Sequence, residues 1–403
     1  LVHFGGKFVR GRQAPKSLTC KLTSLQTPST LQEPLVMQKL ILACCLSMTS
    51  LSALASDPVV FVSAFNSGDE GAIHAYRFDS ATGQLKLLHR TTDVENPFFL
   101  AVSPNGRFLY SIDAPQFGGP NNEFVAAYAI DEHDRRLTRL NRQSTRGTAS
   151  CYLDVDATGK AIVVANYSTG SVAALPVLAD GSLGEASSFV QHAGSSVDPK
   201  RQTGPNAHCI AISPNNRFAL AADLGIDKVL IFNLNPDTAT ITANETQPFA
   251  TLPPGSGPRH LTFHPHGHHV YLINELSNTI TWFDYGAAAG TLQSRQTIST
   301  LPPDFTGTNL TADLKITPDG RFLYGTNRGH DSIAIFRIAA DGRLDLISID
   351  PSLGQGPQNL LITPNGRWLL CANMPGNNLV VFAIDANTGK LTPAGEPVSL
   401  PMP

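Results

Sequence analysis

Apolar and polar residues alternate along most of the chain after residue 57, in short runs separated by turns rich in Pro, Asn, Asp and Gly. The clearest unit, SPNGRFLYSID at Ser103, places a tight turn between two alternating segments, which predicts two antiparallel strands joined by a hairpin. Similar units begin at Asp156, Ser213, His264, Thr317 and Thr363. Almost no helical period lies between them, so the pattern predicts an all-β protein.

A further alternating strand follows about 15 residues after the turn units. Seven such segments occur, at residues 72–78, 124–130, 171–177, 228–234, 279–285, 332–338 and 378–384. The turn units are 46–57 residues apart, which leaves room for four strands in each repeat. Repeats of this length built from four strands are typical of β-propellers. We therefore predict a seven-bladed β-propeller with four-stranded blades.

The two ends of the repeat region suggest how the ring closes. The first repeat lacks a turn unit and starts directly in strand-like sequence near residues 57–66, while residues 391–400 are spare strand-like sequence. A blade built from strands of both ends of the repeat region would remove an exposed sheet edge. We therefore expect the ring to be closed by N- and C-terminal strands, with the C-terminal segment adding a strand to the first blade.

The segment before residue 56 has a different composition. Residues 1–36 have little apolar periodicity, and we expect a disordered upstream extension there. Residues 37–55 combine an early lysine, an apolar run and the ending Ala53-Leu54-Ala55, which is typical of a secretory signal peptide. The run is shorter than the roughly 20 residues of a spanning helix. We expect residues 56–403 to form one exported propeller domain in the periplasm, with no membrane association in the mature form.

Charge and cysteine content argue against a nucleic-acid-binding protein and against a disulfide-rich protein. The first 55 residues hold six basic residues and one acid, so the remainder has 23 basic and 31 acidic residues and a net charge near −8. A domain this acidic is a poor partner for nucleic acid. Its cysteines, Cys151, Cys209 and Cys371, are too few and too widely spaced for a disulfide framework, and we expect buried thiols.

The repeat also predicts which residues meet near the propeller axis. In each blade, the residue five positions before the turn unit and those ten and eleven positions after it should lie on one rim. The first position holds Phe98, Cys151, His208, Arg259, Ala312 and Gln358. The second holds Asp113, Asn166, Asp223, Asn274, Asn327 and Asn373. The third holds Ala114, Tyr167, Leu224, Glu275, Arg328 and Met374.

Positions that differ between blades are the candidates for chemistry. His208, Arg259, Glu275 and Arg328 fall on the same rim in three consecutive blades, and we predict that these four residues are catalytic. We interpret the Asp or Asn that recurs at the second position as structural, because its side chain can hydrogen-bond the local turn backbone. The predicted substrate-binding residues are Asp223, Asn274, Asn327 and Gln358.

Four histidines crowd a single turn unit at His264, His266, His268 and His269. Such a cluster suggests a zinc site, but zinc needs three or four ligands that converge tetrahedrally. A tight turn rarely converges them, and this turn lies at the opposite end of the strand from the predicted rim. We therefore expect solvated turn histidines, no metal site and no cofactor.

Several of these segments resemble a known family. They are SPNGRFLY, AADLGIDKV, GPRHLTFHP with YLINEL, TPDGRFLYGTNRGHDSI and GPQNLLITPNGRWLLCAN. Together they are similar to the seven-bladed propeller lactonases, which include bacterial 6-phosphogluconolactonases and fungal carboxymuconate-lactonizing enzymes. The resemblance covers roughly residues 57–395. It implies that His208, Arg259 and Glu275 match the family's rim histidine, arginine and glutamate, and that Arg328 matches a further arginine. Gln358 departs from the family, where many members carry arginine.

The resemblance and the rim residues together predict lactone hydrolysis. This reaction needs a base to activate water and donors for the oxyanion that develops on the carbonyl. A neutral histidine can be that base, and two guanidiniums can stabilise the oxyanion. No G-x-S-x-G nucleophile elbow occurs in the chain. Cys209 lies next to His208, but neighbouring strand residues point apart, which argues against a Cys-His pair.

The substrate is expected to be a small sugar lactone. Export and the neutral Gln358 favour hydrolysis of glucono-1,5-lactone to gluconate, as in the periplasmic gluconolactonases. The first alternative is a 6-phosphogluconolactonase of the pentose phosphate pathway. The second is a muconate-lactonizing isomerase in which Arg259 and Arg328 hold substrate carboxylates. The third is a non-catalytic propeller scaffold, which would not need four such residues on one rim.

Overall fold

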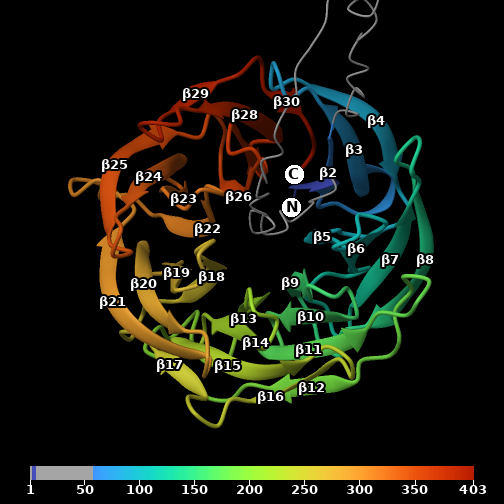
Figure 1. Cartoon of the computed structure of the whole chain (residues 1–403), viewed down its shortest axis with the longest axis horizontal. Helices are drawn as coiled ribbons and strands as arrows, with labels where there is room; N and C mark the ends of the chain where they lie inside the picture. Colours follow the sequence, from blue (N-terminus) through green and yellow to red (C-terminus); the bar gives the residue numbers. More distant parts are fainter. Residues whose placement is uncertain (1, 6–57) are drawn as a thin grey trace, which may run out of the picture. The chain divides into compact units, whose positions relative to one another are not determined.

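A computed structural model of the chain describes residues 2–5 and 58–403. These residues form seven antiparallel sheets arranged in a ring, and Figure 1 shows the ring seen along its axis. The described residues contain one short 3₁₀ turn, Gly68–Glu70, and no α-helix. The prediction of an all-β, seven-bladed propeller with four-stranded blades is confirmed. None of the helical segments in the described part of the chain is long and apolar enough to cross a membrane.

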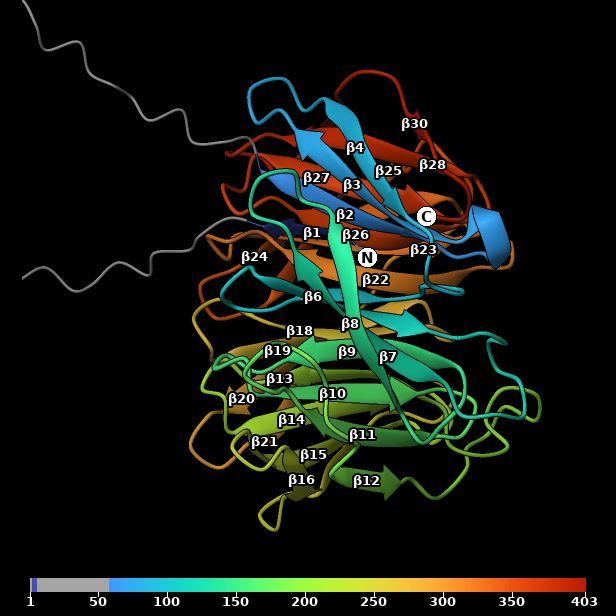
Figure 2. The ribbon, with the colours of Figure 1, turned by 90° about the vertical axis from the view of Figure 1, so that its right-hand side faces the viewer.

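Each blade begins with a strand beside the axis and ends with a strand at the circumference (Figures 1 and 2). The innermost strands are β1 (Val2–Gly5), β5 (Leu100–Val102), β9 (Ser150–Val155), β13 (Ala207–Ile212), β18 (Pro258–Phe263), β22 (Leu310–Ile316) and β26 (Pro357–Ile362). The second strands are β2 (Val59–Ala64), β6 (Phe108–Asp113), β10 (Ala161–Asn166), β14 (Phe218–Asp223), β19 (His269–Asn274), β23 (Phe322–Arg328) and β27 (Trp368–Asn373).

The third strands match the seven segments predicted from the repeat. They are β3 (Ala72–Phe78), β7 (Phe124–Ile130), β11 (Ser171–Pro176), β15 (Lys228–Asn235), β20 (Thr279–Gly286), β24 (Ser332–Ile338) and β28 (Asn378–Ile384). The outer strands are β4 (Leu85–Thr91), β8 (Leu137–Ser144), β12 (Ser188–Gln191), β16 (Thr240–Ala243), β21 (Thr291–Ser299), β25 (Leu344–Pro351) and β29 (Leu391–Pro393). Two short strands, β17 (Phe249–Thr251) and β30 (Val398–Ser399), add to β15 and β28.

The ring closes differently from the prediction. The C-terminal strands β29 and β30 pair with β28 of the last blade, not with the first blade. A short turn joins β29 to β28, so the free edge of β28 is the nearest pairing partner. The innermost strand of the first blade is instead β1, which pairs with β2. The seam is held by packing of Leu400 with first-blade residues and by the Phe65 amide, which donates to the Met402 carbonyl (2.8 Å).

The expected signal segment, residues 37–55, lies outside the described residues. Most of the expected extension, residues 1–36, lies outside them as well. The exception is β1, which falls within residues 1–36 and pairs with β2. Cleavage after Ala55 would therefore separate β1 from the first blade.

Neighbouring blades are joined by a repeated tyrosine contact. The hydroxyl of a second-strand tyrosine donates to a glycine carbonyl in an outer hairpin of the next blade: Tyr271 to Gly342 (2.7 Å) and Tyr324 to Gly389 (2.8 Å). Gly389 has φ +75°, and a Cβ there would lie 2.4 Å from the Phe322 ring. Glycine is therefore required at this turn for both its backbone conformation and the close approach. The contact therefore ties the second strand of one blade to the outer hairpin of the next.

Candidate active site

The rim residues predicted from the repeat coincide with β-bulges. The pairing register shifts around His208 in β13, Arg259 in β18 and Gln358 in β26, so that each of these residues is an extra residue in its strand. A bulge re-aims the side chain that it carries and is common beside active sites. In β22 the irregular stretch contains Ala312 and Asp313. The bulges explain why one residue in each of these inner strands turns toward the axial cavity.

Glu275 is the centre of the site. Its Oε2 accepts hydrogen bonds from Arg259 Nε (2.9 Å) and Arg328 Nη2 (2.8 Å), and its Oε1 accepts one from Arg201 Nη2 (2.6 Å). Glu275 is only 3% exposed. Burial would raise the pKa of this carboxyl, but the guanidiniums of Arg328, Arg259 and Arg201 together hold it below its usual value. The carboxylate is therefore ionised and orients three cations.

Arg259 and Arg328 are held from two sides. Arg259 is almost fully buried, and its Nη1 also donates to the Ala312 carbonyl (2.5 Å). Arg328 donates to the Thr311 carbonyl (2.9 Å) and to Gln358 Oε1 (3.2 Å). Burial, and then the charge of Arg259, lowers the pKa of Arg328 to about 10. The Arg328 guanidinium is therefore still charged at neutral pH. These hydrogen bonds hold both guanidiniums in position.

His208 lies beside this cluster. Its Nε2 is 3.9 Å from Glu275 Oε2, too long for a hydrogen bond, and its Nδ1 is 3.6 Å from Cys151 Sγ. The ring packs edge-on against Tyr167 (5.1 Å between centroids). Burial, followed by the nearby charge of Arg259, lowers the pKa of His208 well below its usual value. The ring is therefore a neutral imidazole at neutral pH, which is the form that can accept a proton.

Two further polar groups of the site were not predicted from the sequence. Arg201 lies in the long connection between β12 and β13, and besides Glu275 it contacts the Tyr167 hydroxyl (3.2 Å). This connection is longer than the corresponding connections of the other blades, so the repeat could not place Arg201. His260 follows Arg259 in β18, and strict alternation would point it away from the rim. The bulge instead brings His260 Nε2 to 3.2 Å from Arg259 Nη1.

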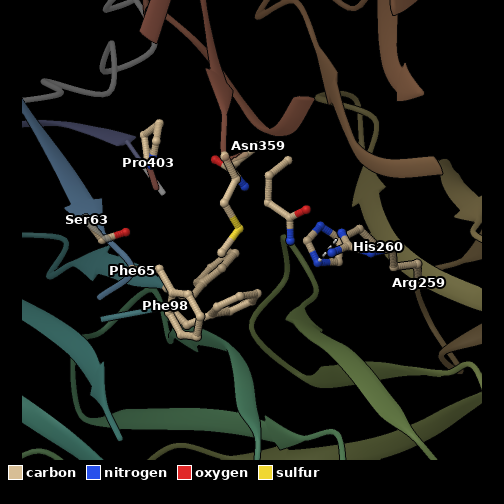
Figure 3. Close-up of a pocket in the computed structure, with 10 residues that line it drawn as sticks. Ser63, Phe65, Phe98, Arg259, His260, Asn359 and Pro403 are labelled. Atoms are coloured by element: carbon tan, nitrogen blue, oxygen red, sulfur yellow. Dashed lines mark hydrogen bonds between the residues drawn. The ribbon is translucent and has the colours of Figure 1, made fainter. Parts of the chain in front are cut away.

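An axial cavity adjoins these residues. Figure 3 shows Phe65 and Phe98 across the cavity from His260 and Arg259. Gln358, Asn359 and Met374 also line it. Phe65 and Phe98 pack edge-on (5.1 Å between centroids) and form an apolar wall. The cavity therefore offers a charged, hydrogen-bonding side and an apolar side, as small-molecule sites commonly do.

The structure does not bring the other predicted substrate-binding residues into this cluster. The Asp223 carboxylate is bonded to buried His192 (2.7 Å) and to the amide of Asn206 (2.7 Å). Asn274 donates to Thr279 and Thr281 of its own blade, and Asn327 accepts from Thr300 and donates to Ser332. All three are buried. Their contacts agree with the interpretation that the recurring Asp or Asn is structural.

Cys209 has no part in this cluster. It packs in the core between blades, and burial raises the pKa of its thiol to about 12. Cys151 and Cys371 are also buried and free. A thiol that stays protonated at neutral pH is a poor nucleophile.

The turn histidines lie beyond the end of β18 opposite Arg259. His266 and His268 are exposed, but the expectation that all four are solvated is wrong for His264. That side chain is 6% exposed, and its Nε2 lies 3.0 Å from the Gly320 carbonyl of the next blade. A neighbouring blade covers the turn, which the repeat alone does not reveal. Within residues 2–5 and 58–403, no three His, Cys, Asp or Glu side chains are arranged so that they could hold a metal ion together.

Changing His264, His266, His268 and His269 together to Asn is expected to leave lactonase rates within a few-fold of wild type. The reason is that the turn and Arg259 lie at opposite ends of β18. Loss of the His264 contact to Gly320 should reduce stability by about 1 kcal/mol. Steady-state rates and thermal melts check both points. A variant that folds but has no activity would contradict this assignment and reopen the metal interpretation.

The fold is a β-propeller in which a histidine, three arginines and a glutamate converge at one rim. Residues 59–403 match the family described as "Lactonase, 7-bladed beta-propeller". The chain belongs to this family and is a lactonase, an enzyme that hydrolyses a cyclic ester. Membership in an enzyme family leaves the scaffold alternative without support.

Individual relatives carry two different names. The chain is 34% identical to a Bacillus subtilis protein named 6-phosphogluconolactonase, over 85% of this chain and 96% of that protein. A Pectobacterium carotovorum protein of the same name is 32% identical over 83% of this chain and 93% of the relative. Among solved structures, the periplasmic gluconolactonase PpgL of Pseudomonas aeruginosa is 33% identical with a TM-score of 0.80, over 86% and 97% of the two chains.

Proposed function

We propose that this lactonase hydrolyses a sugar 1,5-lactone to the aldonic acid, with glucono-1,5-lactone as substrate and gluconate as product. The observation that carries the proposal is the convergence of Arg259 and Arg328 on buried Glu275, beside the neutral imidazole of His208. Such a site supplies fixed cations for an oxyanion and a base for water, which are the two requirements of ester hydrolysis.

His208 is the proposed general base. It takes a proton from water as the water oxygen attacks C1 of the lactone. When the tetrahedral intermediate collapses, the bond from C1 to the ring oxygen breaks and the ring oxygen receives the proton. The product carboxylic acid then ionises in solvent. Because the ring of His208 is neutral at neutral pH, no proton has to be removed from it before the reaction begins.

Arg259 and Arg328 are the proposed oxyanion donors. Glu275, the Ala312 carbonyl and the Thr311 carbonyl hold the two guanidiniums before substrate arrives. Fixed donors stabilise developing charge without reorganising during the reaction. Gln358, which accepts from Arg328 and lines the cavity, is in position to contact a substrate hydroxyl.

A second candidate substrate is 6-phosphogluconolactone. Arg201, Arg259 and Arg328 surround the single carboxylate of Glu275, which leaves two positive charges in excess within this group of four residues. Arg201 has a side chain 34% exposed, so solvent and an anionic substituent of a substrate can reach its guanidinium. This charge balance and the names of the relatives favour the phosphate ester. The neutral Gln358 and the expected periplasmic location favour the unphosphorylated lactone.

Initial rates on glucono-1,5-lactone and on its 6-phosphate, with and without a chelator, test the proposal. We expect hydrolysis well above the spontaneous rate for at least one of the two, with a higher kcat/KM for glucono-1,5-lactone. Chelator should not abolish the rate. A strong preference for the phosphate ester would transfer the assignment to the second candidate. Turnover of a muconate, with neither sugar lactone hydrolysed, would refute the proposed function.

A further inference from the structure

A line of hydrogen bonds leads from Arg259 through His260, which also lines the cavity, to Asp313 and Lys315. His260 Nε2 is 3.2 Å from Arg259 Nη1, and His260 Nδ1 is 2.9 Å from Asp313 Oδ1. Asp313 Oδ2 then accepts from Lys315 Nζ (2.6 Å) and from the Leu360 amide (2.9 Å). His260 and Asp313 are buried, and they come from adjacent blades. The proposed reaction assigns no role to any of these three side chains.

The partners of His260 determine where its proton lies. An arginine nitrogen only donates, so His260 Nε2 must be the acceptor that faces Arg259. The proton of the neutral ring therefore lies on Nδ1 and is donated to Asp313. Burial and the charge of Arg259 lower the pKa of His260 to about 3, which keeps the ring neutral. Burial would raise the pKa of Asp313, but Lys315 and the bond from His260 hold it well below its usual value.

We propose that Asp313 is a positioning residue of the active site, which acts through His260 on Arg259. Asp313 fixes the tautomer of His260, and that tautomer presents a lone pair to Arg259 Nη1. This lone pair of His260, the Glu275 carboxylate and the Ala312 carbonyl together set the direction in which the Arg259 guanidinium faces the cavity. The inference rests on the proposed role of Arg259 as an oxyanion donor, but the tautomer itself does not depend on any substrate.

The surroundings of Asp313 make one substitution especially informative. In Asp313→Asn, the Lys315 ammonium and the Leu360 amide are both donors, so they select the side-chain oxygen of the asparagine at the Oδ2 position. The asparagine NH₂ must then face His260 Nδ1, which becomes an acceptor. The ring proton moves to Nε2 and points at Arg259 Nη1, so that two donors oppose each other. The size of the side chain hardly changes, and the expected effect is therefore a change in tautomer.

The experiment combines kinetics with NMR of the full chain labelled with ¹⁵N-histidine. In wild type, His260 should carry its proton on Nδ1, and in Asp313→Asn on Nε2; the His260→Gln spectrum assigns the resonance. A small displacement of a catalytic group can cost about 10²-fold. We expect Asp313→Asn to lower kcat/KM by about 10²-fold, mainly through kcat, because an oxyanion donor acts in the transition state.

Two variants of His260 separate positioning from a merely structural role. The glutamine of His260→Gln can accept from Arg259 and donate to Asp313, so this variant should lose no more than about ten-fold. His260→Leu can do neither and should lose about as much as Asp313→Asn. The matched control is Asp284→Asn, which alters another His-Asp pair of the same blade (His269 Nδ1 to Asp284 Oδ1, 3.2 Å) and should keep wild-type rates.

Three results would overturn the proposal. They are a wild-type His260 with its proton on Nε2, full activity of Asp313→Asn despite a changed tautomer, and a His260→Gln variant as impaired as His260→Leu. A wild-type protein that hydrolyses neither sugar lactone would overturn the proposed function instead. The NMR result would then still decide whether Asp313 fixes the tautomer of His260, so the two failures are distinguishable.

Discussion

Replacing His208 by alanine is expected to lower kcat/KM for lactone hydrolysis by ~10²–10⁴-fold, the usual contribution of a positioned general base. The ring lies within 3.9 Å of the carboxylate that orients Arg259 and Arg328, so a water held by His208 is next to the proposed oxyanion donors. The measurement is initial rate against lactone concentration, corrected for spontaneous hydrolysis. Loss of the base should appear mainly in kcat.

The pH profile gives an independent check on His208. Burial and the charge of Arg259 lower the pKa of this imidazole, so the active neutral form persists as pH falls below 6.5, the ordinary histidine value. We expect kcat/KM to stay level through pH 6.5, and its acid limb to lie well below that value. The matched control is Cys209→Ala at the adjacent, core-facing position, which should retain wild-type rates. A fully active His208→Ala would exclude His208 as the base.

Much of the fold could be predicted because the repeat is regular. Seven third strands occur at nearly constant spacing, and the structure places all seven within a residue or two of the expected segments. The same regularity identified His208, Arg259, Glu275, Arg328 and Gln358, which the structure brings together at one rim. A position defined by its distance from a turn keeps its place in every blade, so residues from distant parts of the chain could be compared directly.

The parts that could not be predicted depend on departures from the repeat. Arg201 lies in the connection between β12 and β13, which is longer than the corresponding connections of the other blades, and the sequence gives no sign that Arg201 reaches Glu275. The contact of His260 with Arg259 depends on a bulge, which brings two consecutive side chains together where alternation would separate them. Strand pairing at the seam depends on competition between free sheet edges, and the pattern of apolar residues is the same whichever edge is used.

Replacing Glu275 by glutamine is expected to damage stability and activity together. The carboxylate accepts from Arg201 at one oxygen and from Arg259 and Arg328 at the other. A glutamine offers one acceptor oxygen, and its NH₂ would have to face a guanidinium. Buried Arg259 and the partly exposed Arg328 and Arg201 would then have no counterion in this cluster. Removing one partner of a buried ion pair costs about 3–5 kcal/mol, and the exposure of Arg201 and Arg328 places the expected loss at the lower end. Denaturant unfolding should show this loss, and kcat/KM should fall by at least about 10²-fold as the oxyanion donors separate.

A double-mutant cycle with Arg201→Gln identifies the cause of that loss. If unpaired positive charge destabilises Glu275→Gln, removing one of the three arginines should restore part of the lost free energy of unfolding. The effects of the two substitutions on stability should then not be additive. Activity should not return in the double variant, because Arg259 and Arg328 would still lack the carboxylate that aligns them. Additive losses of stability would show that Glu275 contributes through packing. A Glu275→Gln variant with wild-type kcat/KM would show that the arginines are positioned without it.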